Sequence, residues 1–174
     1  MHQRALKSNV HIMKGDMRNK DTIARILIAD SNSLFREKMK QIITDNFDFT
    51  LTSEACSEDD MLNELGEYTF DVLILDTELS DGNGLDVLKK IKIRNPGMPV
   101  LIMSMFPVEQ YEESVFRAGA HGYVSKVNLS NELITALHQI SQGKKYFSSQ
   151  CIGNSEKNPE FPAWETERCR KEDI

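Results

Sequence analysis

The stretch that decides the fold is Phe-Asp-Val-Leu-Ile-Leu-Asp, residues 70–76. It runs apolar over four residues and then stops on an acid, Asp76, which is followed by turn residues and a helical pattern. A continuous apolar run of this kind is typical of a strand buried on both faces of a sheet. A carboxylate that ends such a strand lies at the carboxyl edge of the sheet, where open α/β folds bind their ligands. Asp76 is therefore the first candidate for a functional residue.

Strand and helix patterns alternate on both sides of this stretch. Four other short β-prone runs occupy residues 26–29, 49–55, 99–103 and 123–125. Helical apolar spacing fills the intervals between them, and Gly119 and Gly143 suit the ends of two of these helices. The first helix has Ser33 as its expected N-cap and Leu34 on its apolar side. Five βα units with short connections predict an α/β fold, a parallel sheet with helices on both faces.

The two ends of the chain differ from this alternating region. Residues 1–23 are basic, and we expect a disordered leader, although the spacing there also fits a short helical stripe of Leu6, Val10, Met13 and Met17. Residues 148–174 are rich in Ser, Asn, Pro and charges, which predicts a disordered polar tail. We therefore expect the folded domain at residues 24–147, a length that can bury its own core.

The composition excludes several classes of function. The chain of 174 residues has a net charge of -6, which argues against nucleic acid as the main partner, because phosphate binding uses clustered Lys and Arg. No apolar run is long enough to cross a membrane and no apolar signal core begins the chain, so we expect a cytoplasmic protein. Three cysteines without a CxxC pair, and histidines away from any ligand spacing, argue against a disulfide framework and a zinc site.

The ends of the predicted strands bring together a set of polar side chains. Because every βα strand ends on the same edge of the sheet, that edge should collect Asp30, Asp76, Ser104 and Lys126. Acidic oxygens favour a hard cation such as Mg²⁺. A magnesium ion together with an ammonium group and a hydroxyl suits a phosphoryl group.

Four motifs, in the right order and spacing, resemble the receiver domain of two-component response regulators. They are residues 26–31, 75–85, 100–104 and 118–126. The resemblance covers residues about 24–147 and implies a flavodoxin-like, doubly wound five-stranded sheet of order 2-1-3-4-5. The ending at residues 143–148, together with Val127, is similar to the subgroup whose receiver normally precedes a helix-turn-helix output domain.

By position, the resemblance implies that Asp76 is the phosphoacceptor. Its carboxylate would attack the phosphorus of a phosphohistidine on a sensor histidine kinase and become an acyl phosphate. Asp30 and Asp76 would hold Mg²⁺, helped by the backbone carbonyl of Glu78. Lys126 would pair with a phosphoryl oxygen, and Ser104 would move inward to donate a hydrogen bond to the phosphoryl group. The chain would be a phosphoprotein in a phosphorelay and would not be an enzyme with a separate substrate.

The same resemblance implies a two-state switch. Tyr123 would swing with Ser104 and change the surface of helix 4, strand 5 and helix 5, which an unidentified downstream protein would read. Homodimers are also implied, with Leu133 and Leu137 as candidate contacts, although core packing explains these two residues equally well. The tail after Phe147 is short and polar for a DNA-binding domain, so direct binding to nucleic acid is not carried over to this chain.

Three positions depart from the family pattern. Ser31 stands where the family has a second acid that touches the metal, and a neutral hydroxyl is a poorer Mg²⁺ ligand than a carboxylate. We expect weakened Mg²⁺ binding and slower phosphorylation. Ser80 replaces a frequent proline, and Met105 is bulky where small residues are common. Ser31 also leaves open a pseudo-receiver, an interaction module of the same fold that does not depend on phosphate.

Two further classes are less consistent with the residues. A flavin-binding flavodoxin-like protein needs a phosphate loop rich in glycine after the first strand, and residues 30–35 contain none. A haloacid-type phosphatase needs a second acid two positions beyond its nucleophile. Glu78 has that spacing, but it follows the third strand and lacks the threonine turn of that class.

Overall fold

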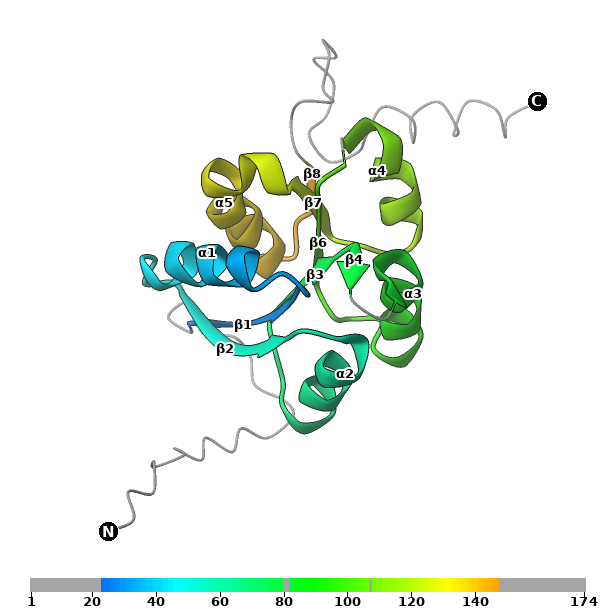
Figure 1. The fold of residues 1–174 in the computed structure, drawn as a ribbon, viewed down its shortest axis with the longest axis horizontal. Helices are drawn as coiled ribbons and strands as arrows, with labels where there is room; N and C mark the ends of the chain where they lie inside the picture. The colour runs from blue at the N-terminus through cyan, green and yellow to red at the C-terminus, as the bar shows by residue number, and fades with distance from the viewer. Residues whose placement is uncertain (1–22, 80–81, 107, 148–174) are drawn as a thin grey trace, which may run out of the picture.

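A parallel sheet forms the centre of the protein, seen in a computed structural model that describes residues 23–79, 82–106 and 108–147 (Figure 1). The sheet has the strand order β2-β1-β3-β6-β7-β8. Its strands are β1 (Ala24–Ala29), β2 (Phe49–Ala55), β3 (Val72–Asp76), β6 (Val100–Ser104), β7 (Gly122–Ser125) and β8 (Tyr146–Phe147). The first five reproduce the predicted order 2-1-3-4-5, so the flavodoxin-like fold class is confirmed.

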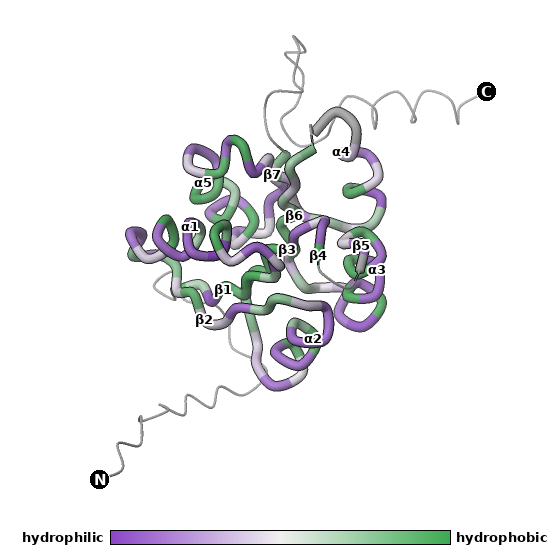
Figure 2. The backbone as a smooth tube through the Cα atoms, viewed as in Figure 1, coloured by the Kyte–Doolittle hydropathy of each residue, from purple (hydrophilic) through white to green (hydrophobic). Residues whose placement is uncertain are grey.

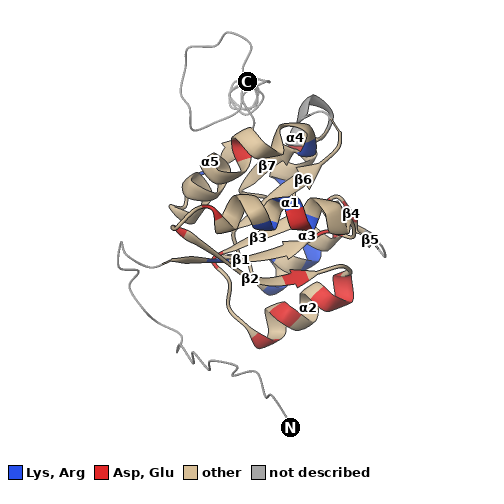
Figure 3. Cartoon of the chain, turned by 60° about the vertical axis from the view of Figure 1, so that its left-hand side comes forward, with Lys and Arg blue, Asp and Glu red and all other residues tan. Residues whose placement is uncertain are grey.

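Helices cover both faces of this sheet, as predicted (Figure 1). They are α1 (Ser33–Thr44), α2 (Glu58–Glu67), α3 (Gly84–Arg94), α4 (Val108–Arg117) and α5 (Leu129–Ser141). Helices α1 and α5 share one apolar cluster with the sheet, and α2, α3 and α4 share the other. None of the described helices is long and apolar enough to span a bilayer. Three acids of α2, Glu58, Asp59 and Asp60, lie in its first turn, where they interact favourably with the helix dipole, and acids continue along the helix (Figure 3).

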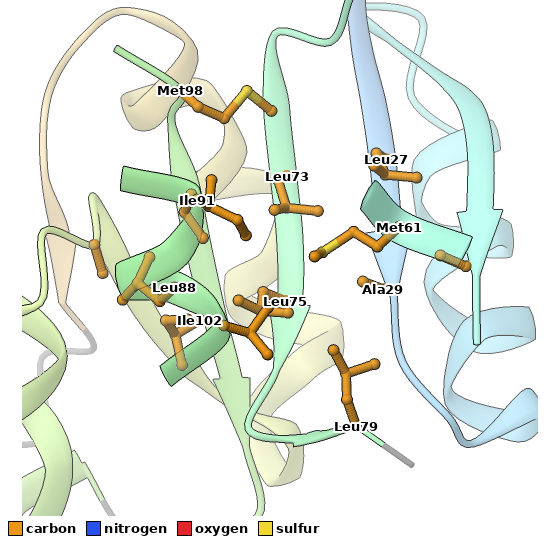
Figure 4. Close-up of a cluster of buried hydrophobic side chains, with 14 of the residues drawn as sticks. Leu27, Ala29, Met61, Leu73, Leu75, Leu79, Leu88, Ile91, Met98 and Ile102 are labelled. Atoms are coloured by element: carbon orange, nitrogen blue, oxygen red, sulfur yellow. The ribbon is translucent and has the colours of Figure 1, made fainter. Parts of the chain in front are cut away.

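The burial of β3 on both faces of the sheet explains why its sequence is a continuous apolar run. All five of its residues are buried, and alternate side chains enter the two clusters. Leu73 and Leu75 pack towards Met61 of α2 and Ile91 of α3 (Figure 4), and the tube through β3 is correspondingly hydrophobic (Figure 2). A shift of β3 by one residue would exchange the side chains that enter the two clusters and would move Asp76 from its place at the sheet edge, so the register matters to the site.

The start of α1 differs from the prediction. The N-cap is Asn32 and not Ser33: the Asn32 side chain accepts hydrogen bonds from the backbone amides of Leu34 and Phe35. Leu34, which was expected on the apolar side of this helix, is instead 79% exposed. The sequence could not distinguish two adjacent residues that are both good caps. The predicted tail and, apart from Ile23, the predicted leader lie outside the described residues.

A sixth strand, β8, was not predicted and corrects the expected five-stranded sheet. It pairs in parallel with β7, matching Gly122 with Tyr146 and Tyr123 with Phe147. Gly122 makes the pairing possible, because a Cβ atom there would lie 2.4 Å from the carbonyl oxygen of Tyr146. The Phe147 ring also packs on Phe116 of α4, with ring centroids 5.6 Å apart. The last described strand therefore lies directly against the strand that contains Tyr123.

We predict that Gly122→Ala detaches β8 from the sheet. The new methyl group would collide with the backbone of Tyr146 and with Ile140, and backbone cannot give way as a flexible side chain can. The amide of Tyr146, which now donates to the carbonyl of His121 at 2.9 Å, should lose protection in hydrogen exchange. Gly66→Ala is the matched control, since nothing lies within 4 Å of its added methyl. Unchanged protection at Tyr146 in the Gly122 variant would show that this contact does not decide the pairing.

Candidate functional site

Four polar side chains are buried at the carboxyl edge of the sheet. They are Asp30, Asp76, Ser104 and Lys126, each at most 4% exposed, and they are the whole set of buried polar or charged side chains among the described residues. Asp30 follows β1, Asp76 ends β3, Ser104 ends β6 and Lys126 follows β7. The parallel sheet therefore brings to one edge four residues that are far apart in sequence.

Lys126 holds the two carboxylates together. Its Nζ atom lies 2.7 Å from Asp30 Oδ2 and 2.8 Å from Asp76 Oδ2. The same ammonium group lies 4.6 Å from the centre of the Phe35 ring. Two acids against one base leave an excess of negative charge in a site with little access to water. Such a site favours a cation or an electrophilic group.

The second oxygen of Asp76 is free to react. Asp76 Oδ1 is buried and makes no hydrogen bond with any described residue. Burial is the main cause that raises the pKa of Asp76 above its ordinary value, and Asp30 adds to this effect, whereas Lys126 opposes it. A desolvated carboxylate oxygen without a partner is a better nucleophile and metal ligand than one held by several donors.

Asp30 is more tightly held than Asp76. Its Oδ1 accepts a hydrogen bond from the backbone amide of Asn32 at 2.7 Å, and its backbone carbonyl accepts one from Arg36 at 2.6 Å. Asn32 in turn caps α1. The start of α1 thus fixes Asp30, which leaves Asp76 as the less constrained carboxylate of the pair.

The loop after Asp76 depends on a glycine that the sequence interpretation overlooked. A Cβ atom on Gly84 would lie 2.4 Å from the carbonyl oxygen of Asp76 and 2.6 Å from Thr77 Cα. The Gly84 amide also donates to the Thr77 carbonyl at 3.1 Å. Close approach of the α3 N-terminus to the backbone of Asp76 requires glycine at position 84. The short strands β4 (Glu78–Leu79) and β5 (Gly82–Asn83) form the intervening hairpin.

Ser31 and Glu78 contact each other beside the carboxylates. Ser31 Oγ donates to the backbone carbonyl of Glu78 at 3.1 Å. This is the carbonyl that the family resemblance predicts to be a ligand of Mg²⁺. Within the described residues, no three His, Cys, Asp or Glu side chains come together. The charged part of the site is therefore a carboxylate pair with a hydroxyl in the third position. Ser80 and Asp81 lie outside the described residues.

Ser104 and Tyr123 belong to one hydrogen-bonded chain. Ser104 Oγ accepts from the Thr77 hydroxyl at 2.9 Å and from the Phe106 amide at 3.2 Å. The hydroxyl of Tyr123 donates to the Phe106 carbonyl at 2.7 Å, and its ring is fully buried. Tyr123 thus lies inward in this structure, while Met105 is half exposed at the rim of the site. The predicted switching roles of Ser104 and Tyr123 stay predictions.

We predict that Asp76→Asn raises the free energy of unfolding at neutral pH. Because burial raises the pKa of Asp76, the folded protein binds its proton more tightly than the unfolded chain does. The stability of the wild type therefore falls as the pH rises from the ordinary carboxyl range through the raised pKa. In acid, Asp76 is protonated in both states and the advantage of the neutral amide should vanish. Urea unfolding over a pH series measures both limits.

The exposed acid Asp45, at the end of α1, offers the control Asp45→Asn. This variant removes the same charge from the surface and should change stability little, because surface charges are screened. A loss of stability in Asp76→Asn at neutral pH, or a gain that does not depend on pH, would contradict the stated origin of the effect.

Comparison with known proteins agrees with this fold. The family model for the response regulator receiver domain matches residues 26–138. The chain is 32% identical over 129 residues to the uncharacterized transcriptional regulatory protein YxjL of Bacillus subtilis, covering 74% of this chain and 59% of that protein. It is 32% identical over 123 residues to the oxygen regulatory protein NreC of Staphylococcus epidermidis, covering 70% of this chain and 56% of NreC. The chain thus spans a little over half the length of these relatives.

Solved structures give the same result. A LuxR-family two-component response regulator from Aurantimonas superposes with a TM-score of 0.68 at 26% identity, covering 72% of this chain and 89% of that one. The isolated receiver domain of RcsB from Salmonella enterica superposes with a TM-score of 0.68 at 21% identity, covering 73% and 94%, and supports the fold alone. With the matched family model, the parallel sheet and the acids at its carboxyl edge, the chain belongs to the response regulator receiver domain family.

Proposed function

We propose that the chain is a phosphorylation-operated switch whose phosphoacceptor is Asp76. The observation that carries this proposal is the state of that carboxylate: one buried oxygen pairs with Lys126 and the other makes no hydrogen bond with the described residues. A free oxygen of Asp76 attacks the phosphorus of a phosphohistidine on a sensor kinase. The new phosphorus–oxygen bond forms as the phosphorus–nitrogen bond breaks, and its electron pair stays with the imidazole.

Lys126 has a second part in this reaction. In the structure its ammonium group pairs with one oxygen of each carboxylate, at 2.7 and 2.8 Å. Phosphorylation converts Asp76 to a neutral acyl group that carries an anionic phosphoryl group, so the negative charge moves outwards by one bond length or more. The ammonium group then pairs with a phosphoryl oxygen while it retains Asp30.

The oxygen atoms at this edge also fit Mg²⁺. Asp30 and Asp76 would hold the ion with the backbone carbonyl of Glu78, and the unpaired buried Oδ1 of Asp76 suits a hard cation. When bound, Mg²⁺ supplies positive charge against the phosphoryl oxygens. Ser31 adds no charge to this set, and its hydrogen bond to the Glu78 carbonyl uses part of that ligand's capacity. We therefore propose a weakened magnesium site.

The signal would leave the domain through protein contacts. The partners on this account are a sensor histidine kinase and an unidentified downstream protein, with homodimers through α5 as a further proposal. Leu133 and Leu137 were candidate dimer contacts, but both are fully buried in the core that α1 and α5 share with the sheet. A dimer would therefore use other residues. YxjL is named as a transcriptional regulatory protein, but DNA binding is not proposed for these residues.

Phosphorylation with a small donor tests the proposal. Purified wild type and Asp76→Asn are incubated with acetyl phosphate and Mg²⁺, and intact mass is recorded. We expect one phosphoryl group on the wild type and none on the variant. Lack of an adduct on the wild type would favour the alternative, a pseudo-receiver, which the Ser31–Glu78 hydrogen bond also supports. An adduct that persists in Asp76→Asn would reject Asp76 as the acceptor.

We predict that Ser31→Asp strengthens Mg²⁺ binding roughly ten- to thirtyfold. A carboxylate about 4 Å from a divalent cation gains roughly 2 kcal/mol even at the dielectric constant of water. Isothermal titration measures the affinity. Ser33→Asp adds the same charge two residues away on the exposed start of α1 and should change the affinity much less. Equal affinities of wild type and Ser31→Asp would sink the idea that this position limits metal binding.

A further inference from the structure

Thr77 and Ser104 form a pair of hydroxyls between two neighbouring strands. Thr77 directly follows Asp76 at the end of β3, and its amide donates to the Met103 carbonyl at 3.0 Å. This bond extends the parallel pairing of β3 with β6 by one step and brings Thr77 opposite Ser104. The two hydroxyl oxygens lie 2.9 Å apart. A hydroxyl adjacent to the proposed phosphoacceptor thus contacts the proposed switch hydroxyl.

The hydrogen bonds at Ser104 leave its own hydrogen available. A serine hydroxyl has two acceptor sites and one donor hydrogen. Ser104 Oγ accepts from the Phe106 amide at 3.2 Å and from the Thr77 hydroxyl at 2.9 Å, which fills both acceptor sites. Ser104 is fully buried, so bulk water does not compete for the remaining hydrogen. With Thr77 as the donor of the pair, that hydrogen is available to a third acceptor.

The hydroxyl pair of Thr77 and Ser104 is also connected, through Phe106, to Tyr123, the aromatic residue of the predicted switch. The Phe106 amide donates to Ser104, and the Phe106 carbonyl accepts from the buried hydroxyl of Tyr123 at 2.7 Å. One peptide segment therefore connects the side chain of Ser104 with that of Tyr123. The orientation of Ser104 is defined from both sides, by Thr77 on β3 and by Phe106 in the loop after β6.

We propose that Thr77 is a positioning residue, which orients the Ser104 hydroxyl to donate to a phosphoryl group on Asp76. The proposal rests on the phosphoacceptor role given to Asp76 above. Valine has nearly the same shape as threonine and would pack as well beside β6, so packing alone does not require a hydroxyl at position 77. Only serine or threonine can occupy an acceptor site of Ser104 while packing there.

Three proteins test this role: wild type, Thr77→Val and Thr77→Ser. Beryllofluoride stands in for the phosphoryl group, and fluorine NMR titration gives its affinity. We expect roughly three- to tenfold weaker binding by Thr77→Val, the effect of losing one hydrogen bond, and recovery to within about twofold in Thr77→Ser. Affinity in Thr77→Val that equals or exceeds the wild-type value would overturn the proposal, and so would a Thr77→Ser variant as weak as Thr77→Val.

A second measurement separates this proposal from the phosphoacceptor role itself. Three-bond proton couplings of Ser104, recorded without any phosphoryl analogue, report its side-chain rotamer. We expect a single rotamer in the wild type and Thr77→Ser, and rotamer averaging in Thr77→Val. If the wild type binds no beryllofluoride, the phosphoacceptor proposal fails while these couplings still decide whether Thr77 orients Ser104. Identical couplings in all three proteins would show that it does not.

Discussion

Lys126 lies between two buried carboxylates, and the site depends on that arrangement. Removal of the ammonium group would leave two buried carboxylates without a counter-ion, and breaking a buried ion pair in this way costs about 3–5 kcal/mol. Here one ammonium group serves both Asp30 and Asp76, at 2.7 and 2.8 Å. The pair of acids carries one charge more than Lys126 can neutralise. This excess raises the pKa of Asp76 together with burial, and it suits a site that accepts a metal ion and a phosphoryl group.

The topology of the parallel sheet makes this arrangement of charges possible. Parallel strands with helical crossovers end on one edge, so residues from β1, β3, β6 and β7 meet there although more than ninety positions separate Asp30 from Lys126. Two apolar clusters pack on the two faces of the sheet and fix the position of each strand relative to its neighbours. Gly84 allows α3 to approach the backbone at Asp76, and Asn32 fixes the start of α1 beside Asp30. The charged site is thus supported by packing that contains no charge.

Much of this architecture could be predicted from the sequence, because it depends on patterns with a clear period. Strand β3 is apolar up to its last residue, Asp76, and the residues that end the other strands are found in the same way, where each β-prone run stops. The features that the sequence analysis did not predict have no periodic pattern of apolar residues. Ser33 and Asn32 are equally good caps, so only the structure selects Asn32. Strand β8 has two residues and depends on a missing Cβ at Gly122. The hydrogen bonds of Ser31 and Thr77 are contacts between loops or strand ends that no local pattern encodes.

The central claim is that Asp76, and not its neighbour Asp30, is the carboxylate that becomes phosphorylated. Hydride reduction of an acyl phosphate converts that aspartate to homoserine, which peptide mass spectrometry locates by residue. After incubation with a phosphohistidine donor or acetyl phosphate, we expect homoserine at position 76 and aspartate at position 30. Aspartate at both positions, or homoserine at position 30, would contradict the account.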